Sequence, residues 1–381
     1  MTQENLGQNK YHYYWIDLLR FVSALLVVVC HYRGNFFIEY GLLSNEDKNI
    51  FTQIFFFITR LGNEAVLVFF VLSGFLVGGR AMQRILNNDI DVKSYFIDRF
   101  TRIMLPLLVS LLLVVIIDTI IKKPIPFKDI IGSLFSLQGI VTSNEFNGPL
   151  WSLAYEVWFY ILIGCLMIIC RNKNNKNVIY VFFVLAICIY VFSKLNTMYL
   201  LILFMGTFAF LLPRESIKHL KSKIFILVIL LSCAFVLGQL TSETRSLNLP
   251  AFSFLDRKAT SVFLAFIAAL LIHHLIVAKP QKKIWIKVES ISSKFSDFSY
   301  TLYLTHYPLM YLLTYFCFPK SEQINTPSIS YYLIEVLISI VVAYLIYLVS
   351  EKRTSTVKKY IKKQLTKQQY HAVGHARHGD E

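Results

Sequence analysis

Residues 103–121 read IMLPLLVSLLLVVIIDTII, a run in which Asp118 is the one charged residue. At a rise of about 1.5 Å per residue, a helix of this length spans close to 30 Å, which is the thickness of the hydrocarbon core of a bilayer. The stretch is too long and too uniformly apolar for an ordinary amphipathic helix on the surface of a soluble domain. It therefore predicts a helix that crosses a membrane.

The rest of the chain has the same character. Of its 381 residues, 56% are hydrophobic and 16% are charged, whereas about 25% are charged in an ordinary soluble domain. Phenylalanine and tyrosine are abundant, with 32 and 22 copies, and the mean hydropathy is +0.55. This composition excludes a soluble protein and predicts an all-α polytopic membrane protein.

Further apolar runs resemble residues 103–121 in length. We expect about ten crossings, at Trp15–Tyr32, Leu61–Gly79, Ile103–Ile121, Leu150–Cys170, Val178–Phe192, Met198–Leu212, Ile224–Leu240, Ala259–Ala278, Phe298–Phe318 and Ile329–Val349. The fifth and sixth runs are short, but polar residues 193–197 between them predict a tight turn rather than one long helix. The run Phe51–Ile58 is too short to span, so we expect it to lie at the interface or to re-enter the membrane.

The basic residues give the orientation. The formal net charge is +15, and most loop lysines and arginines fall in the second, fourth, sixth and eighth connections. Because such residues collect at the cytoplasmic face, these connections and both termini are predicted to be cytoplasmic. The charge is thus explained without nucleic acid. We expect one transmembrane domain over residues 1–350 and a flexible basic cytoplasmic tail over residues 351–381. The 6 cysteines lack metal-type spacing, and we expect no metal site.

The first predicted helix carries charge inside an apolar run. Asp17 and Arg20 are three residues apart, so they can pair on one face. Arg20 and His31 are separated by three turns, which places them on one side of the helix with roughly 16 Å between them along its axis. A charged group in a membrane helix is costly, and it therefore marks a candidate functional site. The alternative is that Arg20 extends to the headgroups and His31 lies in the outer interface.

Other polar motifs follow along the chain. Ser73 and Gly74 end an apolar run, where they would either serve a site or allow close helix packing. Arg99 and Arg102, three residues apart at the cytoplasmic start of a helix, suit the binding of an anion, although positive charge at that face explains them equally well.

Two aromatic-rich stretches complete the set. WSLAYEVWFY at residues 151–160 begins with Trp151 and carries Glu156 about two turns below the outer face. FSYTLYLTHYP at residues 298–308 contains Tyr300, and places His306 near the middle of the membrane with a proline soon after it. A carboxylate and an imidazole at these depths need polar partners.

Together these motifs resemble the acyltransferase-3 family of integral-membrane acyltransferases. Arg20 and His31 are similar to its arginine, ten residues, histidine signature. Residues 69–75, 99–102, 151–160 and 299–308 resemble, in the same order, its FFxLSGF, RxxR, WSLxxE and SYxLYLxHxP segments. One departure is Arg353, where relatives often have proline, and an appended hydrolase-like domain found in some relatives is not expected here.

The resemblance implies transfer of an acyl group, usually acetyl from acetyl-CoA, to a hydroxyl of a cell-surface or lipid-linked carbohydrate in a bacterial plasma membrane. It implies acyl-CoA as a co-substrate, no tightly bound cofactor, and contact with membrane lipid and a carbohydrate acceptor. The catalytic candidates are His31, Arg20 and Glu156, the donor-binding candidates are Arg99, Arg102, Ser73 and Gly74, and the acceptor-binding or supporting candidates are Trp151, Tyr300, His306 and Asp17.

Two questions stay open at this point. We expect His31, held by Glu156 or a neighbouring carboxylate, to act as general base, but it could instead carry the acyl group as an acyl-imidazole. Ser73, the amide near Gly74, and Arg20 are candidates for stabilising the oxyanion. The alternative function is a transporter or flippase for a lipid-linked sugar, which would typically show internal repeats.

Overall fold

The computed structural model describes residues 13–142, 147–171, 178–213, 219–241, 256–278, 283–316 and 320–377. The structure is 83% helical, and its described part holds isolated bridges but no strand, which confirms the all-α prediction. The helices are α1 (Tyr14–Phe36), α2 (Ile50–Thr59), α3 (Gly62–Ser73), α4 (Arg80–Leu86), α5 (Val92–Ile120), α6 (Phe127–Leu134), α7 (Trp151–Arg171), α8 (Val178–Lys194), α9 (Thr197–Leu211), α10 (Leu220–Leu240), α11 (Arg257–Leu275), α12 (Lys283–Ser296), α13 (Ser299–Phe316), α14 (Thr326–Val349) and α15 (Thr354–Arg377).

Each predicted crossing coincides with a helix. Within the described residues, 7 helical segments are long and apolar enough to span a membrane, and the pair α8 and α9, bent by 119°, raises this number to 8 if the pair is one span. Helix α13 is not among them, since its tyrosines, threonines, histidine and proline lower its hydropathy. A polytopic membrane protein is therefore supported, and the count of ten and the side of each terminus stay predictions.

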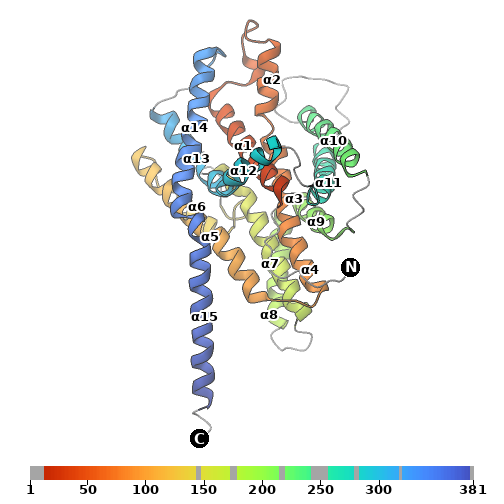
Figure 1. Ribbon diagram of the computed structural model, residues 1–381. Coiled ribbons are helices and arrows are strands. Elements are labelled where there is room, and N and C mark those ends of the chain that lie inside the picture. The colour runs from red at the N-terminus through yellow and green to blue at the C-terminus, as the bar shows by residue number, and fades with distance from the viewer. Residues whose placement is uncertain are drawn as a thin grey trace.

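Helix α1 lies inside the bundle, against α3, α12, α13 and α14 (Figure 1). Helices α9, α10 and α11 pack together beside α3, and α5 packs against both α13 and α7. The core between them is apolar and close-packed, with Leu107, Phe159 and Leu203 fully buried. This arrangement brings residues from α1, α3, α5, α7 and α13 to one place, where the candidate site lies.

Helix α3 changes its winding at the predicted Ser73–Gly74 pair. Residues Gly74–Gly79 form a π-helical turn that leads into α4. A Cβ on Gly74 would collide with the carbonyl oxygen of Leu203 in α9, and one on Gly206 would collide with that of Val71. The small residues thus allow α3 and α9 to touch through their backbones. Turns of this kind are frequent at functional sites, and this one follows Ser73 directly.

Helix α13 continues through Pro308, and the structure accounts for the hydrogen bond that proline removes. The carbonyl of Leu304, which has no amide partner at position 308, accepts from Ser110 Oγ at 2.7 Å and from Asn147 Nδ2 at 3.0 Å. Two neighbouring elements thereby hold α13 in place without a break. The proline loosens the internal bonding of the helix as expected, while these contacts keep its position fixed.

The predicted turn between the fifth and sixth runs is confirmed. The side chain of Asn196 accepts from the amide of Met198, and the amide of Asn196 donates to the Tyr155 hydroxyl at 2.9 Å. These bonds cap α9 and fix the bend. The short run Phe51–Ile58 lies within α2, whose Phe51 is 80% exposed. Its placement at the interface or as a re-entrant segment stays a prediction.

The tail after α14 is helical in its described part, up to residue 377. In Figure 1, α15 continues roughly along the line of α14 and extends beyond the bundle. Its first turns are tied to α5, since Lys358 pairs with Asp98 at 2.6 Å and Lys362 donates to Ser94 at 2.6 Å. The flexibility expected for residues 351–381 stays a prediction, and residues 378–381 lie outside the described part.

Candidate active site

A cavity of about 310 Å³ opens among α1, α3, α5, α7 and α13. Its apolar walls include Phe69, Phe70 and Leu153. Its polar lining comprises Tyr13, Asp17, Arg20, Ser73, Arg80, Arg99, Arg102, Ser152, Glu156, Tyr160, Ser299, Tyr300 and Tyr303. Segments more than two hundred residues apart in sequence therefore contribute polar groups to one space, which is the usual construction of a site for a small molecule.

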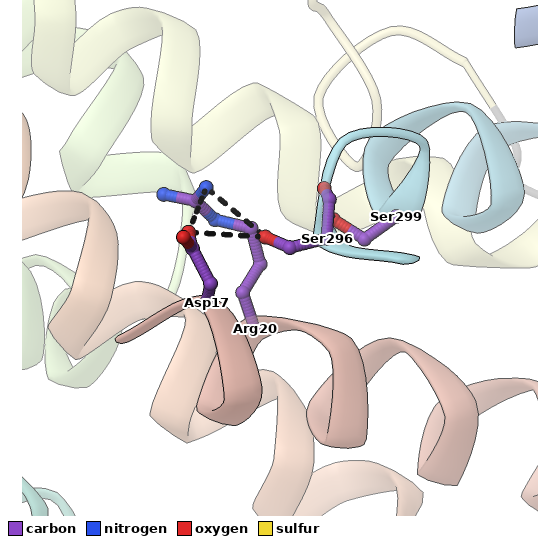
Figure 2. A network of polar contacts seen from close by, with 4 residues as sticks. All are labelled: Asp17, Arg20, Ser296 and Ser299. Atoms are coloured by element: carbon purple, nitrogen blue, oxygen red, sulfur yellow. Dashed lines mark hydrogen bonds and ion pairs between the residues drawn. The ribbon is translucent and has the colours of Figure 1, made fainter. Parts of the chain in front are cut away.

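Arg20 lines this cavity, and polar contacts to neighbouring residues hold its side chain (Figure 2). Its Nη1 lies 3.7 Å from Asp17 Oδ1 and 3.4 Å from Ser296 Oγ, and Ser296 Oγ donates to Asp17 at 3.3 Å. The Ser296 carbonyl in turn accepts from Ser299 Oγ at 2.8 Å, which joins the end of α12 to the start of α13. The predicted Asp17–Arg20 pair is thus present. The contacts with Asp17 and Ser296 hold one end of the Arg20 guanidinium, and the Arg20 side chain also lines the cavity.

Glu156 accepts hydrogen bonds from two hydroxyl groups that also line the cavity. Ser73 Oγ donates to Glu156 Oε1 at 3.0 Å, and the Tyr160 hydroxyl donates to the same oxygen. The Ser73 and Tyr160 oxygens are 2.8 Å apart, so the three groups form one cluster. Glu156 and Tyr160 share a face of α7 because they are four residues apart, whereas Ser73 comes from α3.

The charge of the cavity is positive. Four arginines line it, Arg20, Arg80, Arg99 and Arg102, against the carboxylates of Asp17 and Glu156. Arg99 also lies over the Tyr160 ring, 5.7 Å from its centroid. The Tyr300 hydroxyl lies buried at this cavity and has no hydrogen-bond partner in the described part of the chain. Convergent guanidinium groups with a spare hydroxyl suit a ligand with several anionic oxygens.

A second polar cluster joins α1 to α13. The Nε2 of His306 lies 3.1 Å from Nδ1 of His31, and the two ring centroids are 5.1 Å apart. The Nδ1 of His306 lies 2.8 Å from the Tyr303 carbonyl and 3.1 Å from the Leu302 carbonyl. His306 is fully buried, whereas His31 keeps part of its surface exposed.

When both imidazoles are uncharged, the contacts of His306 favour one tautomer for each ring of the histidine pair. Because carbonyl oxygens only accept, Nδ1 of His306 carries its proton and Nε2 has the lone pair. Nδ1 of His31 must then donate to His306, which leaves the lone pair of His31 on Nε2. In this arrangement the basic nitrogen of His31, Nε2, is on the opposite side of the ring from the Nδ1–H that His306 binds.

The structure places most of the predicted site residues around the cavity and the others outside its lining. Seven of them line the cavity: Asp17, Arg20, Ser73, Arg99, Arg102, Glu156 and Tyr300. The expectation was that Glu156 or a neighbouring carboxylate holds His31. In the structure Glu156 instead binds Ser73 and Tyr160, and the ring of His31 bonds to that of His306, an imidazole. Neither histidine lines the cavity, although Tyr303 lines it and its ring lies 6.0 Å from that of His306.

Gly74 and Trp151 have packing contacts. The amide of Gly74 donates to the carbonyls of Phe70 and Val71, so it is already used within the helix and is a poor candidate for an oxyanion donor. Trp151 packs on Phe70, Tyr155 and Tyr199. Both residues support the walls around Ser73 rather than face the cavity.

Several polar residues at or near the site were not among the residues predicted from the sequence. Tyr160 was predictable, since it lies one helical turn after Glu156 on the same face. Tyr303, whose hydroxyl lies 2.7 Å from Ser152 Oγ and donates to the Pro149 carbonyl at 2.8 Å, belongs to a quoted motif but had no assigned role. Glu351 accepts from the Thr301 amide at 3.1 Å and hydroxyl at 2.8 Å, which caps the start of α13 from fifty residues away. No local pattern predicts that contact.

Comparison with known proteins gives the family. Residues 13–348 match the family model described as an acyltransferase domain of the acyltransferase-3 type. Over 152 residues the chain is 31% identical to "Acyltransferase MdmB" of Streptomyces mycarofaciens, a match that covers 38% of this chain and 36% of that protein. No solved structure matches the chain. The family match covers the helices that build the cavity and the histidine pair, and the chain therefore belongs to the acyltransferase-3 family of membrane-embedded O-acyltransferases.

Proposed function

We propose that this protein transfers an acyl group, most simply acetyl, from cytoplasmic acyl-CoA to a hydroxyl of a cell-surface or lipid-linked carbohydrate. The observation that carries the proposal is the cavity with four arginines and two carboxylates at the predicted cytoplasmic ends of α1 and α5. The phosphates of CoA are the kind of ligand that such a set of guanidinium groups binds. Acyl transfer itself follows from the family.

In this proposal the donor binds with its phosphates on Arg99 and Arg102 and its thioester near Arg20. The guanidinium of Arg20, already oriented by Asp17 and Ser296, would stabilise the oxyanion that forms on the thioester carbonyl. A donor fixed in orientation before reaction is the condition under which such a charge lowers the barrier most.

His31 is the base for the acceptor. Its Nε2 has a free lone pair because His306 accepts from its Nδ1–H. Since His31 lies three turns from Arg20 and outside the cavity lining, it would take the proton of the attacking sugar hydroxyl through intervening water, a role for which imidazole is suited near neutral pH. His31 could also carry the acyl group as an acyl-imidazole, and direct transfer is the simpler case because it needs no covalent intermediate on the ring nitrogen.

The proposal places the protein in a bacterial plasma membrane, with lipid, acyl-CoA and a carbohydrate as its partners. Since the relative matches over only 36% of its length, its own acceptor is no guide to the acceptor of this chain. The sugar and the modified hydroxyl are therefore to be found by experiment.

The direct test uses purified protein in lipid nanodiscs with acetyl-CoA labelled in the acetyl group. Incubation with glycan from a host that lacks this protein should move label from CoA to the glycan, as an ester that alkali removes. Movement of glycan across the membrane without loss of label from acetyl-CoA would instead favour the transporter alternative. In cells, mass spectrometry of surface polysaccharide with and without the protein identifies the modified residue.

A further inference from the structure

The cluster of Ser73, Glu156 and Tyr160 has a geometry that the proposed function does not use. A hydroxyl 3.0 Å from a carboxylate that is itself held by a third group has the arrangement of a nucleophile, its base and an orienting residue. Tyr160 supplies the third group, since its hydroxyl donates to Glu156 and its ring lies under Arg99.

The surroundings of Ser73 suit a nucleophile. Its side chain lines the cavity and is partly exposed to it, so a ligand there can reach the oxygen. Its backbone is fixed, because Gly74 follows it in direct contact with Leu203 of α9. The cavity also holds Arg20 and the unpartnered hydroxyl of Tyr300, which offer donors to an oxyanion formed next to Ser73.

We propose that Ser73 is a covalent acyl carrier activated by Glu156. In the first step Ser73 Oγ bonds to the acyl carbon of the thioester, and Glu156 takes the hydroxyl proton. The bond from the acyl carbon to sulfur breaks, and CoA leaves as a thiolate that takes a proton from water. The product is an ester on Ser73 and a protonated Glu156.

In the second step the acceptor hydroxyl attacks the Ser73 ester. Because His31 does not line the cavity, the proton of the acceptor hydroxyl reaches it through intervening water. His31 is the base of the proposed function, on which this inference rests. The bond from the acyl carbon to Ser73 Oγ breaks, and Glu156 returns its proton to that oxygen. His31 then releases a proton to water, so protons balance over the cycle. CoA has left before the acceptor reacts, so loading of Ser73 by the donor and acylation of the acceptor are separate half-reactions.

The first test is an exchange reaction without any acceptor. Purified protein in nanodiscs receives unlabelled acetyl-CoA and labelled CoA, and an acyl carrier makes label appear in acetyl-CoA. We expect Ser73→Ala to reduce this exchange by on the order of 10³-fold or more. The matched control is Ser232→Ala, since Ser232 is a serine of α10 that donates to the Val228 carbonyl of its own helix and does not line the cavity. Equal exchange in wild type and Ser73→Ala would overturn the proposal.

The second test identifies the attachment site and separates serine from histidine. After brief incubation with labelled acetyl-CoA and acid quenching, peptides should carry acetyl on Ser73. A serine ester survives neutral hydroxylamine, whereas an acyl-imidazole does not. In Ser73→Cys the same position should carry a thioester, so the label becomes sensitive to hydroxylamine. A purely structural serine would not change the chemistry of the bond.

The outcomes distinguish the two proposals. Glycan acetylation with no exchange, no label on residue 73 and full activity in Ser73→Ala would overturn the carrier and leave the proposed function intact. Label on His31 instead would do the same. Failure of the wild type both to exchange CoA and to acylate any glycan would contradict the proposed function itself, and with it this inference.

Discussion

The cavity and the histidine pair are both polar clusters within a largely apolar bundle, but they are built differently. The cavity gathers opposite charges, with four arginines around Asp17 and Glu156, and leaves open space between them. The histidine pair is compact, with His306 fully buried and bonded to the backbone of its own helix. A charged, open cavity suits the binding of an anionic donor, whereas a neutral, preoriented pair suits proton transfer.

This difference implies that the two regions act on different substrates. If the cavity handles the donor and the histidine pair handles the acceptor, substitutions in the two regions should separate the two half-reactions. If both regions act on one step, every substitution should reduce exchange of CoA and glycan acylation together. The following predictions use that separation, beginning with the largest effect.

Glu156→Gln should have the largest effect. The amide retains a hydrogen bond to Ser73 or Tyr160 but cannot take a proton, so both CoA exchange and acylation should fall by on the order of 10³ to 10⁴-fold. Glu335→Gln is the control, since Glu335 is a fully buried carboxylate of α14 without a hydrogen-bond partner in the described residues. Comparable losses in both variants would mean that any buried carboxylate matters and that Glu156 has no special part.

His31→Ala should separate the two regions. Glycan acylation should fall by on the order of 10² to 10³-fold because the base is lost, while CoA exchange at the cavity persists. The measurement is the ratio of the two rates in one preparation, with membrane insertion checked by the amount of extracted folded protein. Equal loss of both rates would place His31 in the first step and end the division between the regions.

Replacing Arg99 and Arg102 together with alanine should weaken donor binding and leave the chemistry after binding nearly intact. A hydrogen bond to a charged group contributes about 1.5–3 kcal/mol, so a net loss of one such bond to the donor should raise the KM for acyl-CoA roughly 10 to 100-fold. Arg84→Ala is the control, because Arg84 is an exposed arginine outside the cavity lining and is predicted to lie on the same cytoplasmic side. An equal rise in Arg84→Ala would show that general positive charge attracts the donor.

The fold was largely predictable because lipid imposes length and apolarity on each crossing. The motif residues were equally visible, since Asp17, Arg20, Glu156 and the arginine pair are polar where lipid disfavours them. Seven of the proposed site residues do meet in one cavity.

The pairings between helices were not predictable. Depth along a helix placed Glu156 and His31 at a similar level, but depth says nothing about which face of α7 meets which neighbour. The close contact of Gly74 and Gly206 with the facing backbones brings α3 against α9, and Ser73 reaches Glu156 from there. Likewise, His306 meets His31 through packing of α13 on α1, which no spacing within one helix specifies.

The smallest effect concerns the partner of the base. His306→Gln keeps an oxygen that can accept from Nδ1–H of His31, whereas His306→Ala removes the acceptor and leaves His31 free to adopt the other tautomer. We expect glycan acylation to fall about 10-fold in the alanine variant and to recover in large part in the glutamine variant, a range consistent with loss of one orienting hydrogen bond. Exchange of CoA should be unchanged in both. If the alanine and glutamine variants reduce acylation equally, the role of His306 is to pack α13 on α1. Another group must then orient the imidazole of His31.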